Sequence, residues 1–214
     1  MRSFRRKQYR TALEECFVRM DELMVTPQGK VELSHLQNPD EDSLNSTAGC
    51  TSTVILVTKT EIYCANAGDS RTVMSSRGTA RELSQDHKPD NPEELRRIER
   101  SGHRVEEGRI DGRLALSRGF GDFEYKNNCA LSAKEQAVTC FPDIRVEPIN
   151  KDTQFVLLAC DGIWDVVTSQ QAITYVHQFV YNKSFNTRKS TIQSIKKGVE
   201  TFLDSCCAND INES

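Results

Sequence analysis

The segment DTQFVLLAC, residues 152–160, constrains the fold of this chain more than any other. Its apolar side chains fill consecutive positions instead of alternating with polar ones, so a strand made from it is apolar on both faces. Such a strand needs a helix or a second sheet on each side. It is too short to cross a membrane, and no other apolar run in the sequence approaches that length. We therefore expect a layered core with this strand at the centre of a sheet.

Short β-rich segments occupy the region before this strand, and turn residues separate them. Their order and spacing predict an antiparallel meander. Further strands are predicted at 103–106, 113–116 and 143–149. The segments of the meander are CTSTVILVTK (50–59), EIYCANAG (61–68), RTVMSSRG (71–78) and TARELSQ (79–85).

The N-terminal region is predicted to be helical. Apolar residues at three- and four-residue spacing predict a helix over 3–25, and the polar, turn-rich residues 26–47 predict a loop. The basic opening MRSFRRKQYR also resembles a targeting or membrane-surface segment. The apolar stripe continues beyond it with acidic residues on the opposite face, which favours a helix packed on the core.

Three more helices are predicted further along the chain. Asn91 as N-cap and Pro92 in the first turn predict a helix that runs to about residue 101 and is closed by Gly102. Thr168 caps the second, and the third runs through 192–203. Helices alternating with groups of strands indicate an α+β fold, with a sheet sandwich flanked by helices in one domain.

Composition excludes several classes of function. Among 214 residues, 37% are hydrophobic and 28% charged, which is typical of a water-soluble domain. The net charge of −3 argues against nucleic-acid binding, which needs a basic excess. Without a secretory segment, an intracellular location in the cytoplasm or nucleus is expected, and the basic N-terminus leaves peripheral membrane association open.

The eight cysteines contain no C-x-x-C pair of the kind used in zinc and redox sites. We expect free thiols in a reducing compartment. Cys50, Cys64 and Cys160 lie in apolar runs, and they are predicted to be buried as small hydrophobic side chains.

The segment FVLLACDGIWDVV, residues 155–167, contains the most informative candidate site. Asp161 ends the apolar strand, and Asp165 follows one helical turn later, so both carboxylates are expected on one side. Two such carboxylates repel each other unless a cation neutralises them, and oxygen ligands select Mg²⁺ or Mn²⁺ over zinc. The alternative is that Asp161 only caps the turn that follows it.

Two weaker candidates lie in ANAGDSR (65–71) and LALSRGFGDF (114–123). Asp69 follows Gly68 between two β-rich segments, where the simplest interpretation is a tight hairpin turn. Gly119 and Gly121 permit irregular backbone next to Arg118, a candidate anion contact whose alternative is a solvated surface arginine.

Taken in order, five segments resemble the PPM-type, or type 2C, metal-dependent serine/threonine protein phosphatases. The resemblance covers nearly the whole chain, and LSQDHKP and DGIWDV are its most specific motifs. The segments are AGCTSTVILV (48–57), ANAGDSR (65–71), LSQDHKPDNPEELRRIERSGHRV (83–105), RIDGRLALSRGFGDFEYK (109–126) and VLLACDGIWDVVTSQQ (156–171).

This resemblance implies a β-sandwich of two antiparallel sheets with helices on both outer faces. It also implies hydrolysis of phosphoserine and phosphothreonine in phosphoproteins by water activated between two Mg²⁺ or Mn²⁺ ions. Asp161 matches a ligand of that metal pair, and Asp69 and Asp165 match ligands of a third ion that Asp161 shares. The segment 107–130 matches a flap beside the cleft.

Within that flap, the cleft residues implied by the resemblance are Arg118, Gly119, Gly121 and Asp122. Asp86, His87 and Lys88 match a structural corner of the family without a catalytic role.

The resemblance also implies residues that this sequence does not contain. The family pattern begins with a phosphate-binding arginine, an acidic pair and an Asp-Gly-His-Gly-Gly turn, and it closes with an Asp-Asn pair before a last strand. We therefore expect 1–214 to be a partial phosphatase domain, inactive or impaired by itself, from a protein that is monomeric when complete. The alternative is a catalytically dead module for binding or regulation.

Overall fold

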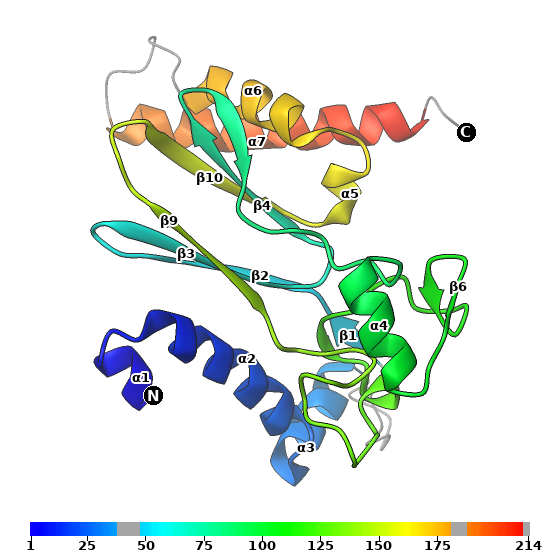
Figure 1. Ribbon diagram of the computed structural model, residues 1–214. Helices are drawn as coiled ribbons and strands as arrows, with labels where there is room; N and C mark the ends of the chain where they lie inside the picture. The colour runs from blue at the N-terminus through cyan, green and yellow to red at the C-terminus, as the bar shows by residue number, and fades with distance from the viewer. Residues whose placement is uncertain (38–47, 181–187, 212–214) are drawn as a thin grey trace.

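Two three-stranded antiparallel sheets face each other in the computed structural model, which describes residues 1–37, 48–180 and 188–211. Helices cover the outer face of each sheet (Figure 1). The first sheet has the order β2 (Ser52–Val57), β3 (Glu61–Ala67), β9 (Asp143–Pro148), and the second has the order β10 (Thr153–Ala159), β4 (Arg71–Ser76), β5 (Thr79–Glu82).

Three apolar clusters separate these layers. Ile62, Cys64 and Met74 pack between the sheets, which makes a sandwich. The outer face of the second sheet packs against helices through a cluster that includes Trp164 and Phe202. The outer face of the first sheet packs against the N-terminal helix region through Phe17, Ala65 and Ala67. The predicted α+β sandwich is therefore confirmed.

The predicted single meander is wrong, because the chain changes sheet between its second and third strands. β3 pairs with β2 and β9, whereas β4 pairs with β10 and β5. Residues 68–70 therefore cross from one sheet to the other and do not form a hairpin turn. Each hairpin was recognisable from local turn signals, but the sheet to which it belongs depends on distant partners.

The strand β10 is apolar on both faces as expected, but it does not lie in the centre of its sheet. Phe155 and Leu157 pack toward the helices, and Val156 packs toward the cluster between the sheets. Among the described strands, β10 pairs only with β4, and Leu158 is 37% exposed. An apolar pattern on two faces therefore predicts packing on both sides of a strand but not its position in the sheet.

The predicted N-terminal helix is divided into α1 (Arg2–Arg5) and α2 (Tyr9–Met24). Lys7 interrupts it with a left-handed backbone (φ 59°). The predicted loop after it is partly wrong, because α3 (Pro27–Gln37) begins there. Thr26 is the local cause, since its side chain accepts a hydrogen bond from Gly29 N and its carbonyl accepts one from Lys30 N. Residues 38–47 of the predicted loop lie outside the described residues.

The middle of the chain largely follows the prediction. α4 (Pro92–Arg100) ends before Gly102, whose φ of 98° suits a residue just beyond a helix. The next strand, β6 (Val105–Glu106), pairs with β7 (Arg109–Ile110), so the second strand of this ribbon comes earlier than the predicted 113–116.

The C-terminal helices begin with α5 (Asp161–Trp164), which directly follows β10. α6 (Ser169–Val180) has the predicted cap, in which Thr168 and Gln171 exchange side-chain and backbone hydrogen bonds. α7 (Arg188–Ile211) packs on α6. None of the helices in the described residues is both long enough and apolar enough to pass through a bilayer.

All eight cysteine thiols are free, but the predicted burial holds for Cys64 and not for Cys50 or Cys160. Cys50 belongs to the two-residue strand β1 (Gly49–Cys50), and Cys160 precedes α5 at the end of its strand. Both positions lie at the ends of apolar runs, and both side chains are exposed.

Candidate functional site

Two strand ends bring the predicted metal ligands to one end of the second sheet. Arg71, which begins β4, pairs with Ala159, which ends β10. Asp69 precedes the first of these residues by two positions, and Asp161 follows the second by two. Antiparallel pairing therefore places both aspartates at the same end. Asp165 is one turn further along α5, with its backbone N–H donating to the Asp161 carbonyl over 2.8 Å.

Lys88 contributes the positive charge of this cluster. Its Nζ donates to Asp69 Oδ2 over 2.6 Å, and the Asp69 side chain is only 7% exposed. Partial burial opposes the charge of Lys88, but the hydrogen bond to Asp69 and the charges of Asp69, Asp165 and Asp161 outweigh it. The pKa of Lys88 is therefore raised. All three predicted ligands thus act on one ammonium group.

The donor set is suited to a hard divalent cation, because it consists of carboxylate oxygens. In the part of the chain that the structure describes, however, no three His, Cys, Asp or Glu side chains are grouped so as to hold a metal ion. Asp69 is instead closed onto Lys88, whose side chain is 39% exposed and has solvent into which to withdraw. Metal binding by Asp69, Asp161 and Asp165 stays a prediction.

Arg71 and Trp164 hold α5 against the sheet. Arg71 forms a bidentate ion pair with Asp86, with distances of 2.9 and 2.8 Å, and its guanidinium lies 5.4 Å from the centre of the Trp164 ring. The indole N–H of Trp164 donates to the Ala159 carbonyl over 2.8 Å. These contacts fix the direction in which α5 leaves the sheet. The positioning function of Arg71 was missed from sequence, although it lies in the GDSR motif.

Gly68 is required where the chain crosses between the sheets. Its φ is 124°, and a Cβ there would lie 2.5 Å from Thr51 Cβ. Gly68→Ala is expected to lower the free energy of unfolding by about 1–3 kcal/mol, the cost of a strained backbone. Urea denaturation followed by circular dichroism measures this change in the free energy of unfolding.

Gly162 provides the matched control, because a Cβ there meets no atom closer than 3.9 Å. Gly162→Ala is expected to be neutral or to stabilise by up to about 1 kcal/mol. Equal destabilisation by the two substitutions would contradict the strain argument.

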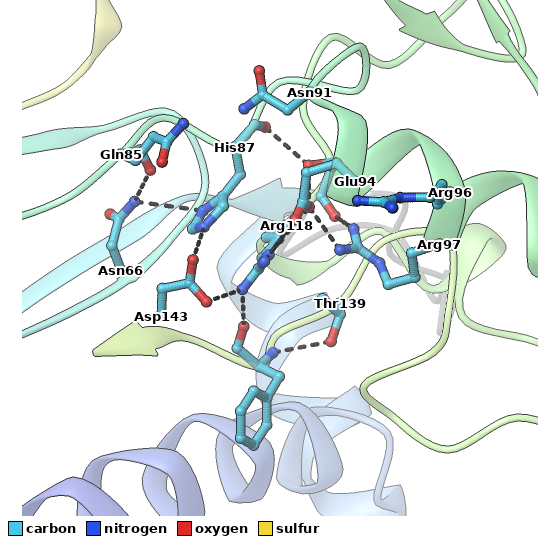
Figure 2. A network of polar contacts seen from close by, with 12 residues as sticks. Asn66, Gln85, His87, Asn91, Glu94, Arg96, Arg97, Arg118, Thr139 and Asp143 are labelled. Atoms are coloured by element: carbon cyan, nitrogen blue, oxygen red, sulfur yellow. Dashed lines mark hydrogen bonds and ion pairs between the residues drawn. The ribbon is translucent and has the colours of Figure 1, made fainter. Parts of the chain in front are cut away.

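A network of ion pairs and hydrogen bonds joins Glu94, Arg97, Arg118, Asp143 and His87, the residue before Lys88 (Figure 2). Glu94 accepts hydrogen bonds from Arg97 over 2.7 Å and from Arg118 over 2.6 Å. Arg118 also donates to Asp143 over 2.7 Å, and Asp143 lies 3.1 Å from His87 Nε2. The hydrogen bond from His87 and the charge of Arg118 keep the pKa of Asp143 below its usual range.

Arg118 is therefore neither a free anion contact nor a solvated surface residue. Its side chain is 10% exposed, and carboxylates of α4 and β9 occupy its guanidinium. Sequence position could not reveal these partners, because they lie 24 and 25 residues away. Contact of Arg118 with substrate stays a prediction.

The neighbouring glycines of the predicted flap allow close packing on β1. A Cβ on Gly119 would lie 2.9 Å from the Cys50 carbonyl oxygen, and one on Gly121 would lie 2.2 Å from that of Ala48. Gly121 belongs to β8 (Phe120–Gly121), which pairs with β1. Both positions therefore require glycine, because a larger side chain would collide with the neighbouring backbone.

Asp122, the remaining cleft residue, precedes the 3₁₀ turn η1 (Phe123–Tyr125) and is buried. Burial raises the pKa of its carboxyl group, and the charge of Lys126 offsets this only in part. Lys126 itself is bound by Asp21 of α2 over 2.5 Å. The predicted flap is thus attached to an N-terminal helix, and its contact with substrate stays a prediction.

Comparison with known proteins places these features in a family. The family model described as Protein phosphatase 2C matches residues 2–209. Protein phosphatase 2C 1 of Paramecium tetraurelia is 39% identical over 99% of this chain and 68% of its own length. Protein phosphatase 2C homolog 3 of Schizosaccharomyces pombe is 46% identical over 80% of this chain and 39% of its own length.

Solved structures agree at the level of the fold. The serine-threonine phosphatase 2C from Toxoplasma gondii superposes with a TM-score of 0.63 at 23% identity, covering 91% of this chain and 63% of that one. The structure of a C. elegans sex determining protein gives a TM-score of 0.59 at 22% identity over 86% of this chain and 42% of that one. With the sequence matches, these findings show that the chain belongs to the protein phosphatase 2C family of metal-dependent serine/threonine phosphatases.

Proposed function

We propose that residues 1–214 form part of one phosphatase domain and supply Asp69, Asp161 and Asp165 to its divalent-metal centre. The supporting observation is that the pairing of β4 with β10 places Asp69 and Asp161 at one end of the second sheet, where Lys88 Nζ donates to Asp69 over 2.6 Å. The substrates are phosphoserine and phosphothreonine side chains of phosphoproteins, in keeping with the family.

The three aspartates approach the cluster from different elements. Asp161 and Asp165 are exposed on α5, and Asp69 lies buried on the crossing between the sheets. Bound Mg²⁺ or Mn²⁺ would supply water of lowered pKa and charge to stabilise the phosphoryl group. Lys88 balances the negative charge of the cluster, and it would have to leave Asp69 for that carboxylate to hold a divalent cation.

The ligand set within 1–214 is incomplete for a metal pair. Asp161 is the one carboxylate that the family resemblance assigns to that pair, and a single aspartate does not hold two hard ions against their hydration. We therefore infer that 1–214 by itself binds a cation weakly and turns over phosphate esters slowly. Further ligands have to complete the catalytic pair.

Mn²⁺ binding tests this proposal. We expect Asp161→Asn and Asp69→Asn each to weaken Mn²⁺ binding by about tenfold, because each removes an anionic ligand from a small set. Asp152→Asn is the matched control, since Asp152 adjoins the opposite end of β10 and pairs there with Arg77. Binding is measured by the electron paramagnetic resonance signal of free Mn²⁺.

Unchanged Mn²⁺ binding in both Asp161→Asn and Asp69→Asn would contradict the metal centre and favour a module for binding or regulation. Hydrolysis of p-nitrophenyl phosphate by 1–214 is expected to stay near background. Turnover well above background that Asp161→Asn abolishes would show that these residues suffice for catalysis.

A further inference from the structure

The backbone next to Asp69 is held by one buried side chain. The Gly68 N–H donates to His87 Nδ1 over 3.1 Å, and the His87 N–H donates to the Gly68 carbonyl over 3.1 Å. His87 is 3% exposed. Both polar groups of Gly68 are thus satisfied by the same residue, at a point where the chain has left one sheet and not yet entered the other.

The second ring nitrogen of His87 faces a carboxylate. Nε2 lies 3.1 Å from Asp143 Oδ2, and the other oxygen of Asp143 accepts from Arg118 (Figure 2). A carboxylate accepts hydrogen bonds, and Nδ1 accepts from the Gly68 N–H. Nδ1 also lies 3.1 Å from the Gly68 carbonyl oxygen, but the carboxylate beside Nε2 can only accept. We therefore infer that the proton of the neutral ring is on Nε2 and that Nδ1 accepts from the Gly68 N–H.

Asn66 supports the same arrangement. Its amide nitrogen donates to the Gly68 carbonyl over 3.0 Å and to the Gln85 carbonyl over 3.2 Å. Together with the bond from the His87 N–H, the Gly68 carbonyl therefore accepts two hydrogen bonds. This leaves the Gly68 N–H as the group that depends on the His87 ring.

With both ring nitrogens engaged and the side chain buried, His87 is not available to transfer a proton to substrate or to bind a metal ion. Its contacts are instead with the backbone that carries Asp69. A backbone with φ of 124° needs surrounding contacts that determine it. The His87 ring supplies such a contact to the Gly68 N–H.

We propose that His87 is a positioning residue, which fixes the Gly68 peptide so that Asp69 is held toward Lys88 and α5. Through Asp143 it also connects this backbone to Arg118 of the predicted flap. This inference rests on the proposed metal function of Asp69. The positioning itself is measurable without metal.

Two substitutions separate the contacts of the ring. Asn at position 87 presents an oxygen near the place of Nδ1, so His87→Asn retains an acceptor for the Gly68 N–H. His87→Gln presents an amide N–H near the place of Nε2, which retains the donor to Asp143 and loses the acceptor for Gly68. Both variants remove the ring, so their general cost in stability is similar.

In metal-free protein, we expect the Gly68 amide to exchange at least about tenfold faster in His87→Gln than in wild type, and the asparagine variant to lie near wild type. Mn²⁺ binding should weaken about tenfold in His87→Gln and less in His87→Asn, the range found for groups that orient metal ligands. Exchange is measured by nuclear magnetic resonance, and binding by the free-Mn²⁺ signal.

Equal Gly68 exchange in the two variants would overturn the proposal. Faster exchange in His87→Gln with unchanged Mn²⁺ affinity, while Asp69→Asn does weaken binding, would also overturn it. If Asp69→Asn has no effect, the proposed metal function fails and the inference fails with it. Should His87→Gln not fold, Asp143→Ala replaces it, because Asp143 is exposed. An unchanged Gly68 amide in that variant would count against the proposal.

Discussion

Replacing Glu94 by glutamine is expected to lower the free energy of unfolding by about 3–5 kcal/mol, the cost of removing one partner from a buried ion pair. The Glu94 side chain is 3% exposed and lies between the guanidinium groups of Arg97 and Arg118. Ser117 also donates to it, over 2.6 Å. Glutamine would leave Arg97 and Arg118 without the anion that they share. Its amide N–H groups would also face the N–H groups of these two arginines.

Glu93→Gln is the matched control for this prediction. Glu93 occupies the same first turn of α4, but it is exposed. Its loss removes a favourable interaction with the helix dipole, worth about 0.3–1 kcal/mol. Urea denaturation followed by circular dichroism measures both variants. A Glu94→Gln effect no larger than that of Glu93→Gln would contradict the importance of the network.

The pH dependence gives the Glu94 prediction a second test. Burial opposes the charge of Glu94, but the hydrogen bond from Arg118 and the charges of Arg97 and Arg118 outweigh it, so its pKa is lowered from 4.5 to about 2. A carboxyl group whose folded pKa is depressed stabilises the fold above its unfolded pKa and loses that contribution as pH falls toward the folded value. The difference between wild type and Glu94→Gln should therefore be constant above about pH 5 and shrink toward pH 2.

Trp164→Ala is expected to cost about 3–5 kcal/mol, as is usual when a large aromatic side chain is deleted from a core. Trp164 is 7% exposed and packs with Ile173 and Phe202 on the outer face of the second sheet. Its deletion removes this packing, the hydrogen bond to the Ala159 carbonyl and the ring beneath Arg71. Because these contacts set the direction of α5, Mn²⁺ binding by Asp161 should weaken as well.

Trp164→Phe separates packing from the polar contact. Phenylalanine keeps most of the buried apolar surface and loses the N–H donor, so a cost of about 1 kcal/mol is expected. Trp164 is the only tryptophan in the sequence, so unfolding must be followed by circular dichroism. Similar costs for the two variants would show that the hydrogen bond, and not the packing, holds α5.

Features that depend on near neighbours in the chain could be predicted from the sequence. Thr168 and Gln171 form their cap because both partners lie within one helical turn. The apolar run forms a strand, and a helix begins at Asp161 directly after it. The four-residue spacing of Asp161 and Asp165 therefore places them one helical turn apart. The apolar content of β10 likewise determined that both of its faces are covered.

Which strands share a sheet could not be predicted from the sequence, because it depends on contacts between distant segments. A segment such as ANAGDSR has the same local turn signals whether it closes a hairpin or crosses between sheets, because both alternatives bury the same apolar pattern. The outcome depends on β9 and β10 as pairing partners, and these strands come more than seventy residues later in the chain.

The partners of the charged side chains were also decided by the tertiary structure. Arg118 pairs with Glu94 and Asp143, and His87 binds the backbone of Gly68. Desolvation makes such partners obligatory once these groups are buried, but the sequence does not contain the distances that select them. A motif therefore indicates which carboxylates belong to a site, whereas packing decides which cation each of them faces.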